Sequence, residues 1–273
     1  MRLSVLVFAA MVLAVGSEAK AQLNTFLQIC GDARSKAREV VSACTKALES
    51  GELPRNVRAK VEANLGVGYY GLGQYKSAIS AYDRAIAINR GFVLAYLNRA
   101  RALERAGRLQ DAANDYATVL SINPRSAEAY LARGAMLLNH GDPRRAIGDF
   151  GRVILLKPEW VSTYFNRGVA YMRLGAYPQA DRDFSLVLRK KPNDAGAYVN
   201  RGRARAALGV KTAAADFNRA IKLRPEWGGA WFARGRYRDK LGRKEAANAD
   251  FLRAYELGYA DPWLLQRVRE LGK

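Results

Sequence analysis

The 273-residue sequence contains one histidine, His140, and two cysteines, Cys30 and Cys44. A single histidine without partner ligands cannot build a histidine metal site or a catalytic triad. The sequence also lacks a phosphate-binding loop, a nucleophile elbow and a zinc-binding pair. We therefore predict no catalytic residue, no metal and no cofactor, and we place His140 at a solvated helix end beside Gly141.

Long apolar runs are also missing, since a membrane-spanning helix needs about 20 apolar residues. The run from Val5 to Val15 covers eleven residues and follows Arg2. Ala19-Lys20-Ala21 then supplies small residues at the two positions that a signal peptidase reads. We predict a signal peptide over residues 1–21, cleaved before Gln22, and a periplasmic or secreted mature protein without a lipid anchor. The alternative is a buried N-terminal helix.

Acidic residues are scarce, with 25 Asp and Glu against 45 Lys and Arg. Without residues 1–21 the counts are 24 and 43, a net charge of +19. Such a charge attracts acidic proteins, polyanions or anionic membrane surfaces. Nucleic acid would be the leading partner of a cytosolic protein, but predicted export argues against it. We expect an acidic protein or peptide, with peripheral contact to an anionic envelope surface as a further option.

The two cysteines lie 14 positions apart, near the start of the predicted mature chain. An even pair in an oxidising compartment predicts a disulfide between Cys30 and Cys44. Two free buried thiols and a metal pair are the alternatives, although no other ligand flanks them. A helix over about residues 35–49 carries Cys44, and we interpret residues 22–58 as an N-terminal helical cap.

The stretch from residue 164 to 192 predicts two helices joined by a tight turn. The first carries small and aromatic residues at helical spacing and stops at Gly175, and the second repeats the spacing and stops at Pro192. These positions are Tyr164, Gly168, Tyr171, Ala180, Phe184 and Val187. Two short helices cannot bury their apolar faces alone, so neighbouring copies must cover them.

The pattern recurs with a period of 34 residues, shortened by one between Gly209 and Ala213. Turn glycines recur at Gly73, Gly107, Gly141, Gly175, Gly209 and Gly242. Aromatic residues of the second helix recur at Tyr82, Tyr116, Phe150, Phe184, Phe217 and Phe251, and those of the first helix at Tyr96, Tyr130, Tyr164, Tyr198 and Trp231. We interpret these aromatic residues as helix-packing core, with an aromatic cofactor or carbohydrate box as the alternative.

This pattern resembles the tetratricopeptide repeat. The resemblance implies an all-α, right-handed superhelical solenoid of about six helix-turn-helix repeats over residues 59–260. Residues 261–273 start with Asp261-Pro262, a cap followed by proline at the first helical position, and predict a C-terminal capping helix. The family's members are scaffolds for many different protein partners, so the resemblance implies protein binding without naming the partner.

Arginine in the first helix and aspartate in the second recur together in repeats two to six, whereas repeat one has Leu65 and Ala81 instead. The pairs are Arg99 with Asp115, Arg133 with Asp149, Arg167 with Asp183, Arg201 with Asp216, and Arg234 with Asp250. We predict structural ion pairs with distances of about 4 Å or less. A role in ligand binding is the alternative.

The resemblance implies that the first helices line a concave groove. We expect an asparagine ladder there, interrupted by Ala132 and Ala233, at Asn64, Asn98, Asn166 and Asn200. The same groove should carry cations at Arg101, Arg105, Arg173, Arg203, Arg236 and Lys240. Its apolar residues should be Leu97, Leu131, Phe165, Val199 and Phe232. An amide offers a peptide both a donor and an acceptor, and arginine suits carboxylates. The alternative is that Asn-Arg-Gly is ordinary helix-surface sequence in such repeats.

Two function hypotheses follow. The first is an exported, non-enzymatic scaffold that binds an acidic protein or peptide segment in this groove. The second is a basic module that adheres to an anionic polymer or lipid surface without sequence-specific recognition. Cations that gather on the first helices favour the scaffold, and cations spread over the other face favour adhesion.

Overall fold

The computed structural model describes residues 19–32, 34–50 and 53–272, and every regular element in these ranges is a helix. The all-α prediction is therefore correct. Most of the predicted signal peptide lies outside the described residues. Residues 19–31 form one helical segment that runs through the predicted cleavage position before Gln22.

The chain divides into two compact units, residues 1–129 and 130–273. The first unit contains α2 (Ala37–Glu49), α3 (Arg55–Gly71), α4 (Tyr75–Ile88), α5 (Val93–Arg105), α6 (Leu109–Ile122) and the start of α7 (Ala127–Asn139). The second contains the rest of α7, then α8 (Pro143–Leu156), α9 (Val161–Arg173), α10 (Tyr177–Lys190), α11 (Ala195–Ala207), α12 (Ala213–Leu223), α13 (Gly228–Lys240), α14 (Lys244–Glu256) and α15 (Pro262–Glu270).

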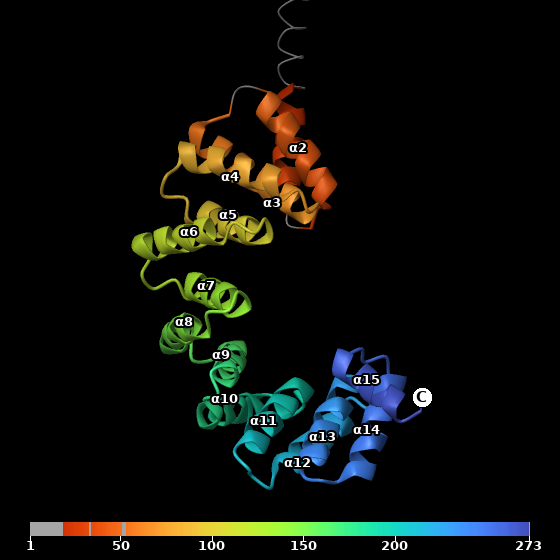
Figure 1. Ribbon diagram of the computed structural model, residues 1–273. Coiled ribbons are helices and arrows are strands. Elements are labelled where there is room, and N and C mark those ends of the chain that lie inside the picture. The colour runs from red at the N-terminus through yellow and green to blue at the C-terminus, as the bar shows by residue number, and fades with distance from the viewer. Residues whose placement is uncertain (1–18, 33, 51–52, 273) are drawn as a thin grey trace, which may run out of the picture. The chain divides into compact units, whose positions relative to one another are not determined.

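The helices form consecutive pairs, as a repeat solenoid requires. In each pair the odd-numbered helix, from α3 to α13, is the first helix of a repeat and the even-numbered helix is the second. Figure 1 shows α3 beside α4 in the first unit and α13 beside α14 in the second, and each of these pairs is in direct contact. Each unit therefore builds its core from the same helix-turn-helix element.

Glycine makes the turn within each repeat. The six predicted turn glycines all have φ between +70° and +91°, a left-handed conformation that costs glycine no Cβ clash. At Gly175 the N–H donates to the Met172 carbonyl at 3.1 Å, and the next N–H, that of Ala176, donates to the Tyr171 carbonyl at 2.9 Å. These bonds satisfy carbonyls at the end of α9, so the helix stops there.

The aromatic residues of the second helices form the core of each repeat. All six, from Tyr82 to Phe251, are at most 1% exposed. In five repeats the ring crosses a glycine of the first helix, and a Cβ there would lie 2.6 to 2.9 Å from the ring. These glycines are Gly66, Gly134, Gly168, Gly202 and Gly235. The rings are therefore packing residues, and a side chain larger than hydrogen at the five glycines would displace them.

The missing residue after Gly209 shortens one helix. α12 has 11 residues, whereas the other second helices have 13 or 14. The Arg201–Asp216 pair still forms, at 2.6 Å, although its sequence separation is 15 instead of 16. The deletion is thus absorbed at the start of α12, and the register of the two helices is kept.

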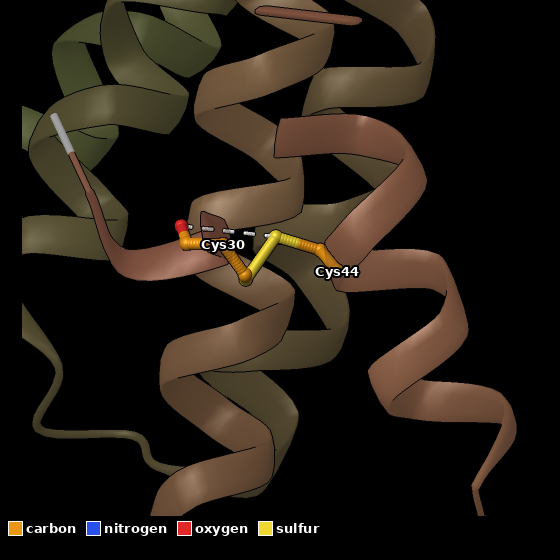
Figure 2. The surroundings of a disulfide bond; sticks show 2 residues. All are labelled: Cys30 and Cys44. Carbon is orange, nitrogen blue, oxygen red and sulfur yellow. Dashed lines mark hydrogen bonds between the residues drawn. A yellow bond between two sulfur atoms is a disulfide. The ribbon is translucent and has the colours of Figure 1, made fainter. Parts of the chain in front are cut away.

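The two ends of the described chain are held differently. Near the N-terminus the predicted disulfide between Cys30 and Cys44 is present, with the two Cα atoms 5.0 Å apart (Figure 2). It joins the helical segment 19–31 to α2. The Cys44 sulfur also lies 3.9 Å from the Cys30 carbonyl oxygen, but this is a contact, because a disulfide sulfur carries no proton to donate.

At the C-terminal end no covalent link is needed, because α15 packs its apolar side on α14. Leu264 and Val268 are buried against Ala247, Phe251 and Ala254. The Asp261 carboxylate accepts a hydrogen bond from the Leu264 N–H at 3.1 Å, which caps α15.

None of the described helices is both long enough and apolar enough to cross a bilayer.

Candidate functional site: the first-helix faces

Five arginine–aspartate pairs join the two helices of repeats two to six. In each pair the Arg Nη2 donates to one carboxylate oxygen of the Asp at 2.6 to 2.8 Å, and Nε donates to the other at 2.8 to 3.0 Å. The five Asp residues are buried, at 1% to 6% exposure. A buried carboxylate needs such a partner, because an unpaired charge in the core is strongly unfavourable.

Each of these arginines also lies over the aromatic ring three positions before it. The distance from the guanidinium carbon to the ring centroid is 4.9 to 5.8 Å, from Arg99 over Tyr96 to Arg234 over Trp231. The hydrogen bonds that Arg99 donates to Asp115 raise the pKa of Arg99, and those donated to Asp149 and Asp183 raise the pKa of Arg133 and Arg167 in the same way. The first-helix aromatics therefore support the ion pairs, and both groups belong to the framework of the repeat.

The structure adds two framework arginines that the sequence analysis did not identify. Arg205 donates to Asp181 at 2.7 Å and to Asp216 at 3.0 Å, and Arg238 lies 2.9 Å from Asp250. Each follows a paired arginine by four residues, so both side chains share one helix face with it. That spacing is the signal that could have found them.

Repeat one contains an ion pair with the charges exchanged between the helices. Glu62 on α3 is 4% exposed and accepts from Arg84 on α4, with Nε at 2.9 Å and Nη2 at 2.8 Å. Glu62 lies three positions before Leu65, and Arg84 lies three positions after Ala81. From the sequence only the absence of the Arg–Asp pair is visible in this repeat, because Glu62 and Arg84 stand at positions that are not equivalent to those of the other pairs.

In the first unit the predicted groove residues lie on α3 and α5. Arg101 is exposed, and no described carboxylate lies within ion-pair distance of it. Arg105 donates to the Tyr75 hydroxyl at 3.2 Å, which raises its pKa. Asn98 is half-buried, and Asn64 lines a cavity of about 270 Å³ beside Cys30 and Val40. Asn64 thus faces the helical segment 19–31 and α2.

In the second unit Asn166 and Asn200 are half-buried on α9 and α11. The Asn200 amide donates to the Gly196 carbonyl of its own helix at 3.0 Å, which leaves its side-chain oxygen as an acceptor. Arg173 donates to the Leu138 carbonyl. The framework therefore already uses part of the hydrogen-bonding capacity of Asn200 and Arg173.

Two of the apolar residues expected on the groove wall are core residues instead. Val199 is 2% exposed and packs in the core with Phe217 and Ala230, and Leu97 is 9% exposed. All five residues directly follow the first-helix aromatic, so the difference comes from packing: the neighbouring helices cover Val199 and Leu97 more completely than the other three. Only the half-buried Leu131, Phe165 and Phe232 remain as partly accessible members of that group.

The structure brings three predicted cations together around one cavity of the second unit, of about 660 Å³. Arg203 comes from α11, and Arg236 and Lys240 come from α13. Phe232 and Tyr237 of α13 and Trp263 of α15 supply aromatic surface. Trp263 was not among the predicted site residues, because it stands outside the 34-residue repeat.

The arginines that line this cavity lack carboxylate partners among the described residues, whereas its carboxylates already have partners within the protein. No described carboxylate pairs with Arg203 or Arg236. Arg203 touches solvent, yet the protein around it desolvates the guanidinium and lowers its pKa, although arginine stays protonated. The Arg236 guanidinium lies 4.3 Å from the Trp263 ring centroid. Asp239 pairs with Lys244 at 2.9 Å, and Asp261 caps α15, so both carboxylates are engaged.

His140 is exposed and directly follows α7. Within the described ranges no group of three His, Cys, Asp or Glu side chains lies close enough to hold a metal ion.

These features define a class of protein: a helical repeat solenoid whose exposed first-helix side chains are free to contact a partner. The tetratricopeptide repeat family model matches residues 64–127, 97–160 and 165–226, more than half of the chain. The chain therefore belongs to the tetratricopeptide repeat family, whose members are generally non-enzymatic scaffolds that bind proteins or peptides. A search for similar sequences among curated proteins finds no match.

Solved structures of low sequence identity share the fold. The C-terminal part of a tetratricopeptide repeat protein from Cytophaga hutchinsonii has a TM-score of 0.70 at 18% identity, covering 89% of this chain and 97% of that one. The type IV pilus biogenesis factor PilW gives 0.65 at 20% identity, with 77% and 98% coverage. YrrB, described as having an unusual peptide-binding site, gives 0.57 at 20% identity, with 68% and 94% coverage.

Proposed function

We propose that this protein is an exported scaffold that binds an acidic segment of another protein through its first-helix faces. The proposal rests on the set of cations that form no ion pair within the described part of the protein. Seven arginines pair with buried aspartates. Arg203, Arg236 and Lys240, by contrast, have no carboxylate partner among the described residues and surround one cavity.

The charge of the second unit supports an acidic partner. Residues 130–273 carry 28 Lys and Arg against 14 Asp and Glu, a net charge of +14. Eight of the 14 carboxylates belong to framework or capping interactions, namely Asp142, Asp149, Asp181, Asp183, Asp194, Asp216, Asp250 and Asp261. A partner with negative side chains would meet a field that accelerates association and discriminates against basic segments.

The asparagines would add neutral hydrogen bonds to the backbone of such a segment. Asn98 lies on the first unit, and Asn166 and Asn200 lie on the second, all half-buried on first helices. An amide offers a donor and an acceptor at once, which matches a peptide unit. YrrB, a fold neighbour described by its peptide-binding site, makes peptide binding a reasonable use of this architecture.

Export rests on the predicted signal peptide and is supported by the disulfide, since disulfides persist in oxidising compartments. Mass spectrometry of the native protein from the envelope and the medium should show a chain that starts at Gln22 and carries no free thiol. Recovery of the full-length, dithiol chain from the cytosol would contradict export.

The binding proposal is tested with a partner captured by crosslinking in the envelope fraction. Replacing Arg101, Arg173, Arg203 and Arg236 by Ala should weaken binding most at low salt, because exposed charges are screened beyond about 8 Å at physiological salt. Replacing Asn98, Asn166 and Asn200 by Ala should weaken binding at all salt concentrations, by about 0.5–1.5 kcal/mol per lost hydrogen bond. Wild-type affinity in a folded Asn variant would exclude the ladder.

A second candidate, adhesion to an anionic polymer or lipid surface, is favoured by a different observation. The C-terminal ends of α10 and α12 carry exposed cations at Arg189, Lys190, Lys191, Lys222 and Arg224. If Ala substitutions at these five positions abolish envelope association while the first-helix variants bind normally, adhesion is the function. Equal competition by unrelated polyanions would support the same conclusion.

A further inference from the structure

The cavity beside Arg203 has two chemically different walls. One wall is cationic, formed by Arg203 of α11 with Arg236 and Lys240 of α13. The other is aromatic, formed by Phe232 of α13 and Trp263 of α15. The cavity has a volume of about 660 Å³, within the range of sites that hold a ligand group of several side chains.

The aromatic wall is held in place by its neighbours. The Phe232 ring centroid lies 5.1 Å from that of Tyr259 and 6.0 Å from that of Trp263, and Trp263 lies 5.1 Å from the buried Phe251. Trp263 nevertheless remains 38% exposed. A ring fixed by packing but open to solvent offers apolar area without a large entropic cost on binding.

The cationic wall is held equally well. Arg236 is stacked on Trp263, so its planar guanidinium is already oriented, with its N–H groups available at the edges. The Lys240 ammonium lies 3.5 Å from the Ala206 carbonyl, a long contact that leaves donors for a ligand. Arg203 faces these groups without any ion-pair partner among the described residues.

We propose that this cavity binds an aromatic side chain that is flanked by carboxylates in an acidic peptide segment. The ring would pack against Phe232 and Trp263, and the neighbouring carboxylates would accept hydrogen bonds from Arg203, Arg236 and Lys240. This inference rests on the proposed function and specifies its ligand, since it requires both chemistries in one short segment.

A segment that matches only one of the two walls would fit this cavity poorly. A purely acidic segment would leave the exposed Trp263 and the partly accessible Phe232 in water, and would bind polyanions of any sequence. A purely apolar segment would bury Arg203 and Arg236 without a counter-charge, which is costly. A basic segment would be repelled by three cations.

The site also depends on α15, which follows the last repeat. Trp263 and Asp261 belong to this helix or its cap, and without them the aromatic lining of the cavity would come from the repeats alone, mainly from Phe232 and Tyr237 of α13. α15 is therefore both a helix that covers Phe251 and a wall of the binding cavity.

The test uses the full mature chain and three fluorescein-labelled peptides: Asp-Glu-Phe-Glu-Asp, Asp-Glu-Ala-Glu-Asp and Asn-Gln-Phe-Gln-Asn. Fluorescence anisotropy at physiological salt should show that the first peptide binds at least about tenfold more tightly than the other two. The Arg203→Gln/Arg236→Gln variant should lose about tenfold in affinity for it, and Trp263→Leu should lose the preference for Phe over Ala.

The matched control is Arg152→Gln/Arg182→Gln, which removes two exposed arginines from the second helices α8 and α10 without touching the cavity. It has the same net charge as the cavity variant and should bind like the wild type. Circular dichroism checks that each variant is folded, and Trp263→Phe, which keeps an aromatic ring, should retain the preference for Phe.

Three results would overturn the inference. Equal binding of the Phe and Ala acidic peptides would show charge recognition alone, and would leave the proposed scaffold function intact. Equal loss in the control variant would assign the effect to net charge. No binding of the first peptide would exclude the site, while the captured partner would still test the scaffold function separately.

Discussion

The first unit, residues 1–129, carries 17 Lys and Arg against 11 Asp and Glu, whereas the second, residues 130–273, carries 28 against 14. The first unit has the disulfide and tyrosines at the core positions 82 and 116. It also has an ion pair in which the acidic residue, Glu62, lies on the first helix and the arginine, Arg84, on the second. The second has phenylalanines at the equivalent positions and the cavity lined by unpaired cations.

The same repeat therefore occurs in both units with different additional features. Turn glycines and packed aromatics are common to both units, so they cannot explain any difference in function. The first unit differs in how its end is anchored, and the second differs in which cations are left unpaired. Residues that depart from the repeat, and not those that define it, are where function should be sought in such proteins.

The largest contrast should come from the buried ion pairs. Asp183→Ala in the second unit leaves Arg167 without its charge partner, and the Arg167 side chain is only 21% exposed. The change should therefore lower the free energy of unfolding by about 3–5 kcal/mol. Glu62→Ala in the first unit leaves Arg84, which is 48% exposed and can be hydrated, so its cost should be smaller. Urea unfolding followed by circular dichroism compares the two. An equal or larger cost for Glu62→Ala would contradict the distinction between the pairs.

Removal of the disulfide should lower the stability of the first unit and leave that of the second unchanged. Replacing Cys30 and Cys44 by Ala should cost about 3 kcal/mol by the chain-entropy estimate for a loop of this length. Because each repeat contacts mainly its neighbours, hydrogen exchange should quicken in α2 and α3 and stay unchanged in α14. Reductant added to the wild type should reproduce the effect. Faster exchange in α14 would show that the two units are coupled in stability.

Alkaline pH should also distinguish the units. Burial raises the pKa of Tyr82 and Tyr116 above the usual value of about 10. Their contribution to stability is therefore complete below pH 10 and is lost as pH rises further, by about 1.4 kcal/mol per tyrosine at pH 11. The Tyr82→Phe/Tyr116→Phe variant, which imitates the second unit, should lose less stability than the wild type between pH 9 and 11. Identical pH profiles would contradict this explanation.

The smallest effect concerns a single hydroxyl at neutral pH. Tyr116 is fully buried, and its hydroxyl has no hydrogen-bond partner in the described part of the chain. Tyr116→Phe should leave stability unchanged or raise it by about 1 kcal/mol, since an unsatisfied buried polar group is unfavourable. Phe150→Tyr is the reciprocal change in the second unit and should destabilise it. A clear loss of stability in Tyr116→Phe would indicate that the hydroxyl is satisfied in solution.

Much of the fold follows from local rules that a sequence displays directly. The 34-residue period, the glycines with positive φ and the apolar spacing predict each helix pair, because turn chemistry and helical periodicity act over a few residues. The disulfide followed from the count of two cysteines and the predicted compartment. The equivalence of repeats also named Arg and Asp positions that the structure brings together.

The binding site followed from the sequence only in part. Arg203, Arg236 and Lys240 could be placed on first helices, but Trp263 lies outside the repeats and gave no periodic signal. Val199 shares its helix with Arg203 and yet is buried, because its accessibility depends on how adjacent helices pack. Arg205 and Glu62 were missed for the same reason, since their partners are 11 to 24 residues away on other helices.

The sequence by itself thus determined that this chain is an array of paired helices with a basic surface and one disulfide. Only the tertiary structure decided that Arg205 and Arg238 also pair with buried aspartates, and which cations remain around a cavity with an aromatic wall. The physical reason is range: turns and helical faces are set by neighbours along the chain, whereas ion pairs and cavities are set by side chains that meet only after the helices pack.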